Sequence, residues 1–183
     1  MNQEQFRKIL SGLNGRTQTD AFAAAKSVLM DSDQRLERGL IRILKNGRRP
    51  FNRAAAAYAM QAIGRPQTIS ALERTLNNSR ESVRVRGEAA EALAHRHLLT
   101  SHRVLLKHLR DSNNDIRFWC AFALGQMAEK KAIPVLEQYS ATDKRIVKGF
   151  HSVAEEAADA VRNVRENKSH RRRGGCVFCV DRS

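Results

Sequence analysis

Two cysteines near the C-terminus have the spacing of a metal chelate. Cys176 and Cys179 stand three positions apart, so both thiolates can bind one tetrahedral ion, and His170 lies six residues upstream as a further candidate ligand. Closed structural zinc sites use four ligands, and this segment supplies too few of them. We therefore expect no resident cofactor. The alternatives left open are zinc held with ligands from elsewhere, a redox pair, or an unstructured end.

Other residue types that could do chemistry are poorly placed for it. His95, His97 and His102 lie close in sequence, but the first two are two positions apart and cannot share a helical face. No carboxylate accompanies them at ligand spacing, so we interpret this stretch as a solvated turn. The acidic pair Glu155-Glu156 is expected to face solvent. Because the sequence has no glycine-rich phosphate loop, GxSxG elbow or paired-carboxylate motif, it favours a non-enzymatic protein.

The charge balance indicates what kind of partner the chain binds. Lys and Arg number 33 and Asp and Glu 19, which gives a net charge of 33 − 19 = +14. Seven basic residues against one acid fall between Arg35 and Arg53, a local charge of 7 − 1 = +6. Such a surface favours acidic partners. We expect an acidic protein, with nucleic acid as the alternative.

The chain shows no sign of export or of membrane insertion. No apolar run has the length of a transmembrane helix, and the first residues lack the apolar core of a signal peptide. Three cysteines, an odd number, argue against a secreted disulfide framework. We therefore expect a cytoplasmic protein.

The elements that position these residues repeat along the chain. Three stretches of the chain align with one another without gaps, and four positions of the alignment hold similar residues: Arg53, Arg86 and Arg117; Ala57, Ala90 and Ala121; Met60, Leu93 and Leu124; Leu72, Leu105 and Leu136. The offsets are 93 − 60 = 33 and 124 − 93 = 31. This period, with small residues in one half and branched aliphatics in the other, is typical of stacked two-helix units. Cys120 stands at a core alanine position, where we expect a buried, unreactive thiol.

Stop signals and apolar spacing predict the helices of the stack. The expected helices cover 3–13, 19–30, 33–45, 50–63, 67–77, 82–96, 101–109, 114–127, 132–139 and 142–165. We group the helices over 50–77, 82–109 and 114–139 as three repeats. The helix over 142–165 is expected to be one long C-terminal cap.

The third repeat resembles the HEAT-like repeat of the type named after phycobilisome lyases. The matching residues are Asn114, Ile116, Arg117, Ala121, Ala123, Leu124, Gly125, Ala132, Pro134 and Leu136. The likeness covers about residues 20–139, and the second repeat departs from it at Ala94 and Arg103. The resemblance implies an α-solenoid. Because such repeats occur in adaptors, scaffolds and bilin lyases, it also implies a chromophore-binding protein as an alternative function.

These observations together predict an all-α protein of two parts. Residues 1–166 form an α-solenoid of stacked HEAT-like helix pairs, and residues 167–183 form a basic, cysteine-containing flexible tail. The arginine column is interpreted as structural, bonding to loop carbonyls or to an acid such as Asp111.

The predicted function is that of an adaptor or scaffold with a basic concave face. In stacks of this kind the second helix of each unit lines the concave side. The residues this places along the groove are Arg42, Lys45, Arg74, Arg103, Lys107 and Arg110.

Overall fold

The computed structural model describes residues 1–31, 33–95 and 101–166 of the chain. The α-helices in these residues are α1 (Gln3–Leu13), α2 (Gln18–Asp31), α3 (Glu37–Asn46), α4 (Pro50–Ala59), α5 (Pro66–Asn77), α6 (Val83–Ala94), α7 (His102–His108), α8 (Asn114–Gln126), α9 (Ile133–Thr142) and α10 (Val153–Arg165). Short 3-10 helices adjoin three of these α-helices: η1 (Gln34–Leu36), η2 (Met60–Ala62) and η3 (Lys130–Ala132). The described residues form no strand and one isolated bridge, between Ile146 and Ser152. The prediction of an all-α solenoid is confirmed.

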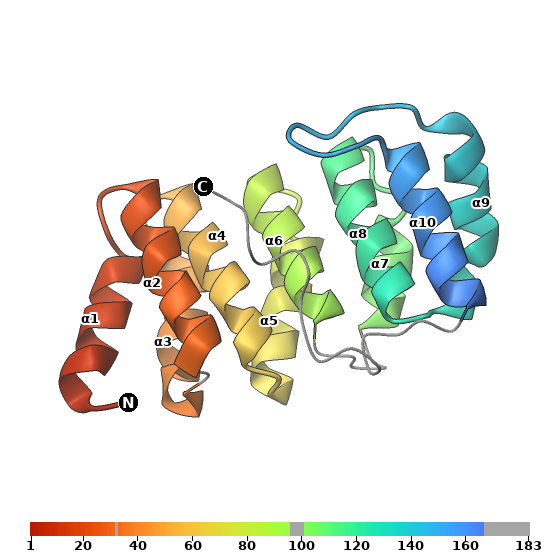
Figure 1. Ribbon diagram of the computed structural model, residues 1–183. Coiled ribbons are helices and arrows are strands. Elements are labelled where there is room, and N and C mark those ends of the chain that lie inside the picture. Colours follow the sequence, from red (N-terminus) through yellow and green to blue (C-terminus); the bar gives the residue numbers. More distant parts are fainter. Residues whose placement is uncertain (32, 96–100, 167–183) are drawn as a thin grey trace.

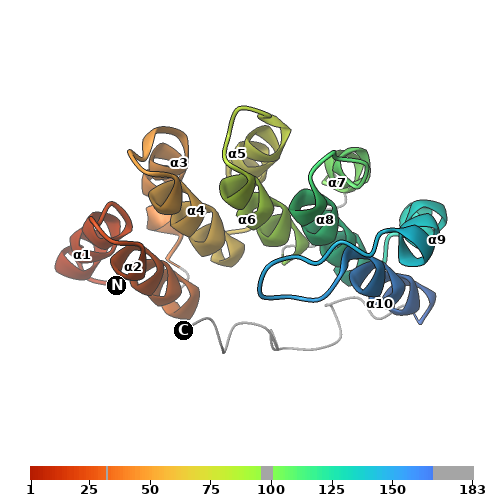
Figure 2. The same ribbon diagram turned by 90° about the horizontal axis from the view of Figure 1, so that it is seen from above.

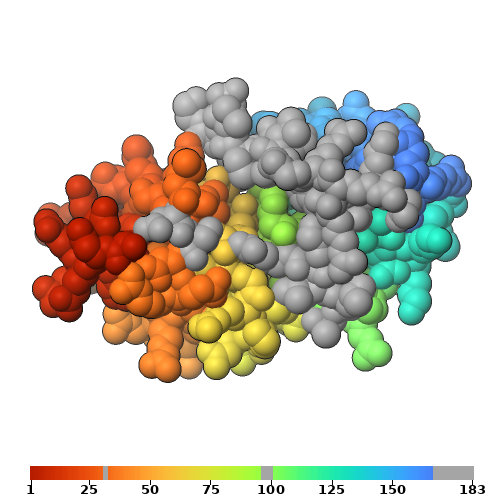
Figure 3. Space-filling view, turned by 60° about the horizontal axis from the view of Figure 1, so that its bottom comes forward, coloured from red at the N-terminus to blue at the C-terminus, as the bar shows by residue number. Residues whose placement is uncertain are grey.

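The helices form two rows (Figure 1). An inner row consists of α2, α4, α6, α8 and α10, which pack on one another in that order; an outer row consists of α1, α3, α5, α7 and α9, each packed on the inner helix that follows it. Seen from above, the rows curve, with the outer row on the convex side and the inner row on the concave side (Figure 2). The elements follow one another along the length of the molecule (Figure 3).

The helix pairs begin one helix earlier than the repeats grouped from the sequence. Helix α5 packs extensively on α6, and α7 packs on α8, whereas α4 and α5 make few contacts. The grouping of 50–77, 82–109 and 114–139 was therefore shifted by half a unit. A periodic pattern sets the length of a repeat but not its starting point, which explains the shift.

Alanine allows the inner helices to approach closely. Four consecutive alanines, residues 54–57, are 0% exposed on α4, and the column of Ala57 is also buried at Ala90 on α6 and Ala121 on α8. At Gly125 on α8, an added Cβ would lie 2.7 Å from Cα of Ala160 on α10. The small side chains thus join the inner row into one continuous core.

Three arginines at equivalent positions connect neighbouring helix pairs. Each is the fourth residue of an inner helix and bonds both to a main-chain carbonyl before that helix and to a carboxylate before the next one. The pairs are Arg53 with Gly47 O and Glu81, Arg86 with Leu76 O and Asp111, and Arg117 with Asp111 O and Asp143. The predicted structural role of this column, and of Asp111 as a partner, is confirmed.

Burial and hydrogen bonding act in opposite directions on the three carboxylates. Burial alone raises the pKa of Asp143, but hydrogen bonds from Arg145 and Arg117 outweigh it, so this pKa lies below its ordinary value. The pKa values of Glu81 and Asp111 are lowered in the same way, against burial, by hydrogen bonds from the arginine column and from backbone amides. All three carboxylates are therefore charged when the stack is assembled at neutral pH.

The C-terminal end differs from the prediction of one long helix over 142–165. Helix α10 begins at Val153, and residues 143–152 form a loop in which Gly149 has a φ of +82°. Ser152 and Glu155 form a capping box that starts the helix. The prediction was wrong because this Ser-x-x-Glu signal and the glycine before it outweigh the apolar spacing through the loop. The shorter α10 packs on α8 and α9 at the end of the stack.

Candidate functional site

The six basic residues predicted for the concave groove lie on the other side of the molecule. All six are exposed, but they belong to α3, α5, α7 and the residues just after α7, which are part of the outer row (Figure 2). The concave placement of Arg42, Lys45, Arg74, Arg103, Lys107 and Arg110 was wrong. The rule that the second helix lines the concave side holds here, but the half-unit shift exchanged first and second helices.

The outer row nevertheless gathers these cations on one surface. Arg103, Lys107 and Arg110 follow steps of four and three along α7 and its end, so they form one stripe. On α3, Arg42 and Lys45 form an equivalent stripe with Arg38, which belongs to the basic cluster between Arg35 and Arg53 but was not placed in the predicted groove. We call the full set the outer basic face: Arg38, Arg42, Lys45, Arg74, Arg103, Lys107 and Arg110.

Acidic residues do little to neutralise the outer basic face. On α3, Glu37 is 4% exposed; it accepts a hydrogen bond from Thr68 Oγ1 at 2.7 Å and lies 3.4 Å from Nη1 of Arg65. On α5, Glu73 is half-buried. Lys107 Nζ donates to Oδ1 of Asn77 at 2.8 Å, which connects the α7 stripe to α5. The outer basic face thus presents seven exposed cations on α3, α5, α7 and the residues just after α7.

The concave side holds a hollow of about 950 Å³ between α2, α6, α8 and the loop 143–152. Three aromatic side chains line it among polar and charged ones: Phe22 on α2, Trp119 on α8 and Phe150 in the loop. The Trp119 and Phe150 rings meet edge to face, with centroids 5.1 Å apart. The guanidinium of Arg84 lies 4.9 Å from the centre of the Phe22 ring and donates to Oε1 of Gln18 at 2.8 Å. We call this feature the inner hollow.

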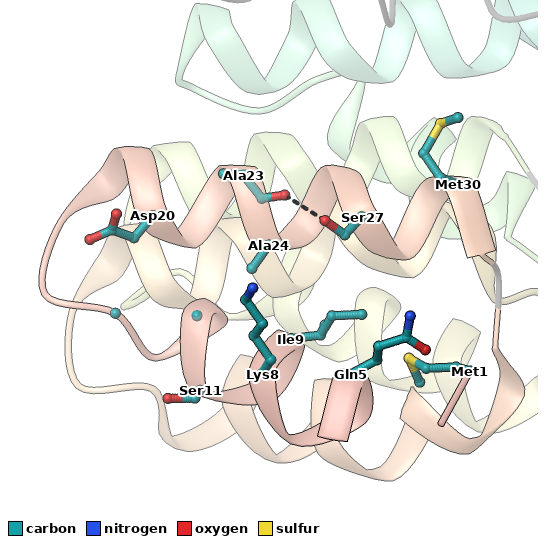
Figure 4. A pocket seen from close by; sticks show the side chains of 12 residues that line it. Met1, Gln5, Lys8, Ile9, Ser11, Asp20, Ala23, Ala24, Ser27 and Met30 are labelled. Carbon is teal, nitrogen blue, oxygen red and sulfur yellow. Dashed lines mark hydrogen bonds between the residues drawn. The ribbon is translucent and has the colours of Figure 1, made fainter. Parts of the chain in front are cut away.

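A second groove lies at the N-terminal end of the stack, between α1 and α2 (Figure 4). Its volume is about 880 Å³, and small or apolar residues such as Ile9, Ala23 and Ala24 form most of its lining. Met30 at its edge is 89% exposed. The lining includes the charged groups Lys8 and Asp20 but no arrangement of a nucleophile beside a base.

The candidate metal ligands are not brought together in the described residues. Residues 1–31, 33–95 and 101–166 contain no group of three or more histidine, cysteine or acidic side chains placed to hold an ion. The His95 ring lies 6.5 Å from that of Phe122, and His102 begins α7. His97, His170, Cys176 and Cys179 lie outside the described residues.

Cys120 is buried in the core, as the sequence predicts. Its side chain is 0% exposed, and burial raises the pKa of its thiol well above the ordinary range. A thiol in this state is a poor nucleophile and a poor metal ligand. Cys120 therefore packs as a small apolar residue.

The acidic pair on α10 is divided between surface and interior. Glu155 is exposed and belongs to the capping box, but Glu156 is 8% exposed, so the expectation that both face solvent was wrong for Glu156. Burial, with a smaller contribution from the charge of Asp159, raises the pKa of Glu156 to about 8. Its Oε2 lies 2.9 Å from Nε2 of His151.

Comparisons with known proteins agree with this architecture. A family model of HEAT repeats matches residues 78–149. This part of the chain is thus similar to HEAT repeats. A chain from the complex of CpcE and CpcF of phycocyanin lyase from Nostoc sp. PCC7120 has a TM-score of 0.69 and 16% sequence identity, covering 87% of this chain and 99% of that chain. This likeness shows a shared HEAT-like solenoid fold, as the resemblance to phycobilisome-lyase repeats implied.

Other comparisons are more distant. Human deoxyhypusine hydroxylase in complex with glycerol has a TM-score of 0.40 and 15% identity, covering 88% of this chain and 84% of that chain. No curated protein sequence matches the chain. None of the helices in the described residues is both long and apolar enough to cross a membrane. The shared feature is thus the HEAT-like solenoid fold.

Proposed function

We propose that this HEAT-repeat protein is a non-enzymatic adaptor that binds an acidic protein partner through its outer basic face. The observation that supports this function is the set of seven exposed cations on α3, α5, α7 and the residues just after α7. Stripes of like charge repel one another and contribute nothing to stability. Their presence on three neighbouring helices is therefore better explained by a negatively charged ligand than by folding.

A rigid helical surface suits this role. The cations stand on helices that are fixed by a common core, so binding immobilises few further groups. The net charge of +14 favours fast encounter with acidic surfaces. Attraction of this kind weakens with salt, because the Debye length falls to about 8 Å at physiological ionic strength.

The shape of the surface favours protein over nucleic acid. The outer row is convex (Figure 2), and a DNA duplex is stiff over about 150 base pairs. A straight duplex touches a convex surface over a short length only, whereas an acidic protein can present a matching curved surface. Nucleic acid remains the alternative that the experiment must distinguish.

The test compares two variants that change the net charge equally. Arg74→Glu, Lys107→Glu and Arg110→Glu together reverse three cations of the outer basic face. The matched control reverses Arg7, Lys130 and Lys131, which are also exposed but lie outside it. Both variants are used for pull-down from native lysate, with and without nuclease, after circular dichroism shows that they fold.

We expect the native chain and the control variant to capture an acidic protein, with or without nuclease. The variant with Arg74, Lys107 and Arg110 reversed should not capture it. Equal capture by both variants would exclude the outer basic face as the binding site. Loss of the ligand on nuclease treatment, with affinity falling log-linearly with salt, would indicate nucleic acid instead. A bilin absorption band in the eluate would support the chromophore-binding alternative.

A further inference from the structure

Side chains from neighbouring helices of the outer row meet where those helices adjoin. At the junction of α5 and α7, Nζ of Lys107 donates to Oδ1 of Asn77 at 2.8 Å. The last residue of α5 thus lies beside a cation of α7. Because the helix pairs repeat, the two equivalent positions adjoin at the preceding junction of the outer row as well.

The preceding junction, between α3 and α5, holds two cations at these positions. The offset 77 − 45 = 32 places Lys45 on α3 where Asn77 stands on α5. The offset 107 − 74 = 33 places Arg74 on α5 where Lys107 stands on α7. A hydrogen-bonded pair at one junction is therefore replaced by two like charges at the other.

The packing of the three outer helices supports this equivalence. Leu44, Leu76 and Leu109 follow the same offsets, since 76 − 44 = 32 and 109 − 76 = 33, and each is at most 4% exposed. Helix α3 contacts α5, and α5 contacts α7. The three helices thus face the core in one register, and Lys45 stands beside Arg74.

Acidic side chains do not neutralise this cation pair. Lys45 and Arg74 are both exposed, and neither forms an ion pair with a carboxylate of the described residues. Glu73, next to Arg74 in sequence, is half-buried, and Glu37 on α3 is buried and lies 3.4 Å from Nη1 of Arg65. Two adjacent like charges repel each other, so the pair attracts an anion more strongly than either cation alone.

We propose that the pair of Lys45 and Arg74 anchors a carboxylate of an unstructured acidic segment of the partner, which lies across the outer row from α3 to α7. This inference rests on the function proposed above and names the kind of acidic partner. Both side chains donate N–H groups and carry a full charge, so one carboxylate accepts from each of them. Its charge also removes the repulsion between the two cations.

The shape of the outer row favours an extended segment over a helix. The row is convex, and a flexible chain can follow its curvature (Figure 2). A helix with carboxylates along one face is destabilised by their repulsion, and bound helices usually lie in an apolar groove. Adjacent helices are about 10 Å apart, so α7 lies about 20 Å from α3. About six residues of extended chain cover this distance.

The next junction of the outer row supplies an internal comparison. Arg110 is equivalent to Lys45 and Asn77, because 110 − 77 = 33 and 77 − 45 = 32. The position equivalent to Lys107 on α9 is the neutral Gln138, because 138 − 107 = 31. Arg110 is thus exposed like Lys45 but has no second cation at the equivalent position of the following helix. Removing its charge should therefore matter less for binding.

Lys45→Asn and Arg110→Asn form the matched pair for the test. Each removes one charge from equivalent positions of the outer basic face, and Lys45→Asn gives the α3–α5 junction the residue type of the α5–α7 junction. Arg74→Gln removes the other member of the cation pair. The probe is a fluorescein-labelled peptide of about ten residues with glutamate at alternate positions, long enough to reach from α3 to α7. Its binding is measured by fluorescence anisotropy at physiological ionic strength, after circular dichroism shows that the variants fold.

We expect the native chain to bind this peptide and not its glutamine counterpart. Lys45→Asn and Arg74→Gln should each weaken binding about tenfold, as expected for the loss of one charge-assisted hydrogen bond. Arg110→Asn should weaken it only about two- to fivefold, as for an exposed ion pair. Equal losses in Lys45→Asn and Arg110→Asn would overturn the anchor. If Lys45→Asn does not fold, Arg74→Gln makes the same comparison.

Two other outcomes would overturn the unstructured acidic segment. One is the absence of peptide binding by the native chain, even where the pull-down captures an acidic protein, because that partner would then be recognised through its folded surface. The other is equal or tighter binding of a single DNA strand with the same charge as the peptide. Equal capture by the two pull-down variants would instead contradict the proposed function, whatever the peptide shows.

Discussion

Arg117 donates two hydrogen bonds to one carboxylate oxygen of Asp143, from Nε at 2.8 Å and from Nη2 at 2.6 Å. Both side chains are almost fully buried, at 3% and 2% exposure. The pair joins the start of α8 to the loop before α10, so the last helix pair of the stack depends on a buried charge pair. Removing one partner of such a pair leaves the other charged and desolvated.

We therefore expect Arg117→Ala to destabilise the chain by about 3–5 kcal/mol. The matched control is Arg145→Ala, because Arg145 bonds to the other oxygen of Asp143 at 2.8 Å but its side chain is 63% exposed. An exposed pair of this kind is worth about 0–1 kcal/mol. Urea unfolding of both variants measures the difference. Equal losses of stability in the two variants would contradict the prediction that burial makes the Arg117–Asp143 pair the more important one.

Gly125→Ala should destabilise the chain although alanine favours helices. The added Cβ would meet the backbone of Ala160 at 2.7 Å, so α8 and α10 would have to move apart. Overpacking of this type costs about 1–3 kcal/mol, more than the roughly 1 kcal/mol gained in helix propensity. Thermal unfolding checks the sign, and a stabilised variant would show that the two helices are not in this close contact.

Acid should weaken the contacts made by the arginine column. The pKa values of Glu81, Asp111 and Asp143 are lowered in the folded state, so the stability they add is fully present above the ordinary carboxyl pKa, about 4, and is lost as the pH falls through the lowered values. Urea midpoints should fall steeply from pH 5 to pH 3. Asp143→Asn should be less stable at pH 5 and should fall less steeply than the native chain.

The fold could be predicted from the sequence because its signals are local. Pro50 and Ser82 mark helix starts that the structure reproduces, and the column of Arg53, Arg86 and Arg117 set the repeat length. The starting point of the repeat was not predictable in this way. The aligned columns are the same whichever helix is taken as the first of each pair. The choice of first helix decides whether Arg42 and Lys107 are assigned to the concave or the convex side.

The inner hollow could not be read from the sequence because its walls are far apart along the chain. Phe22 and Trp119 meet the same hollow only through the curvature of the stack and the loop 143–152. The loop was not predicted because apolar residues continue through it at helical spacing. Its signal was Gly149 followed by Ser152 and Glu155, a short pattern that indicates a helix start more strongly than the apolar residues before it indicate a continued helix.

Glu156 should make the chain less stable as the pH rises. Burial raises its pKa from an ordinary value of 4.5 to about 8, so the folded chain holds a proton that the unfolded chain has lost. Its contribution to stability is therefore fully present below about pH 4.5 and is lost as the pH rises toward 8. Glu156→Gln keeps the shape of the side chain without its charge and should stabilise the chain at pH 8 by on the order of 1–3 kcal/mol.

The neighbouring acid supplies the control for this prediction. Glu155 is exposed, and hydrogen bonds from the Ser152 hydroxyl and backbone amide lower its pKa, so Glu155→Gln should have the opposite sign and should destabilise the chain above the ordinary carboxyl range. Urea unfolding at pH 5 and pH 8 should show a smaller decline for Glu156→Gln than for the native chain. An unchanged decline would contradict the prediction, because it would mean that Glu156 is charged in the folded state despite its burial.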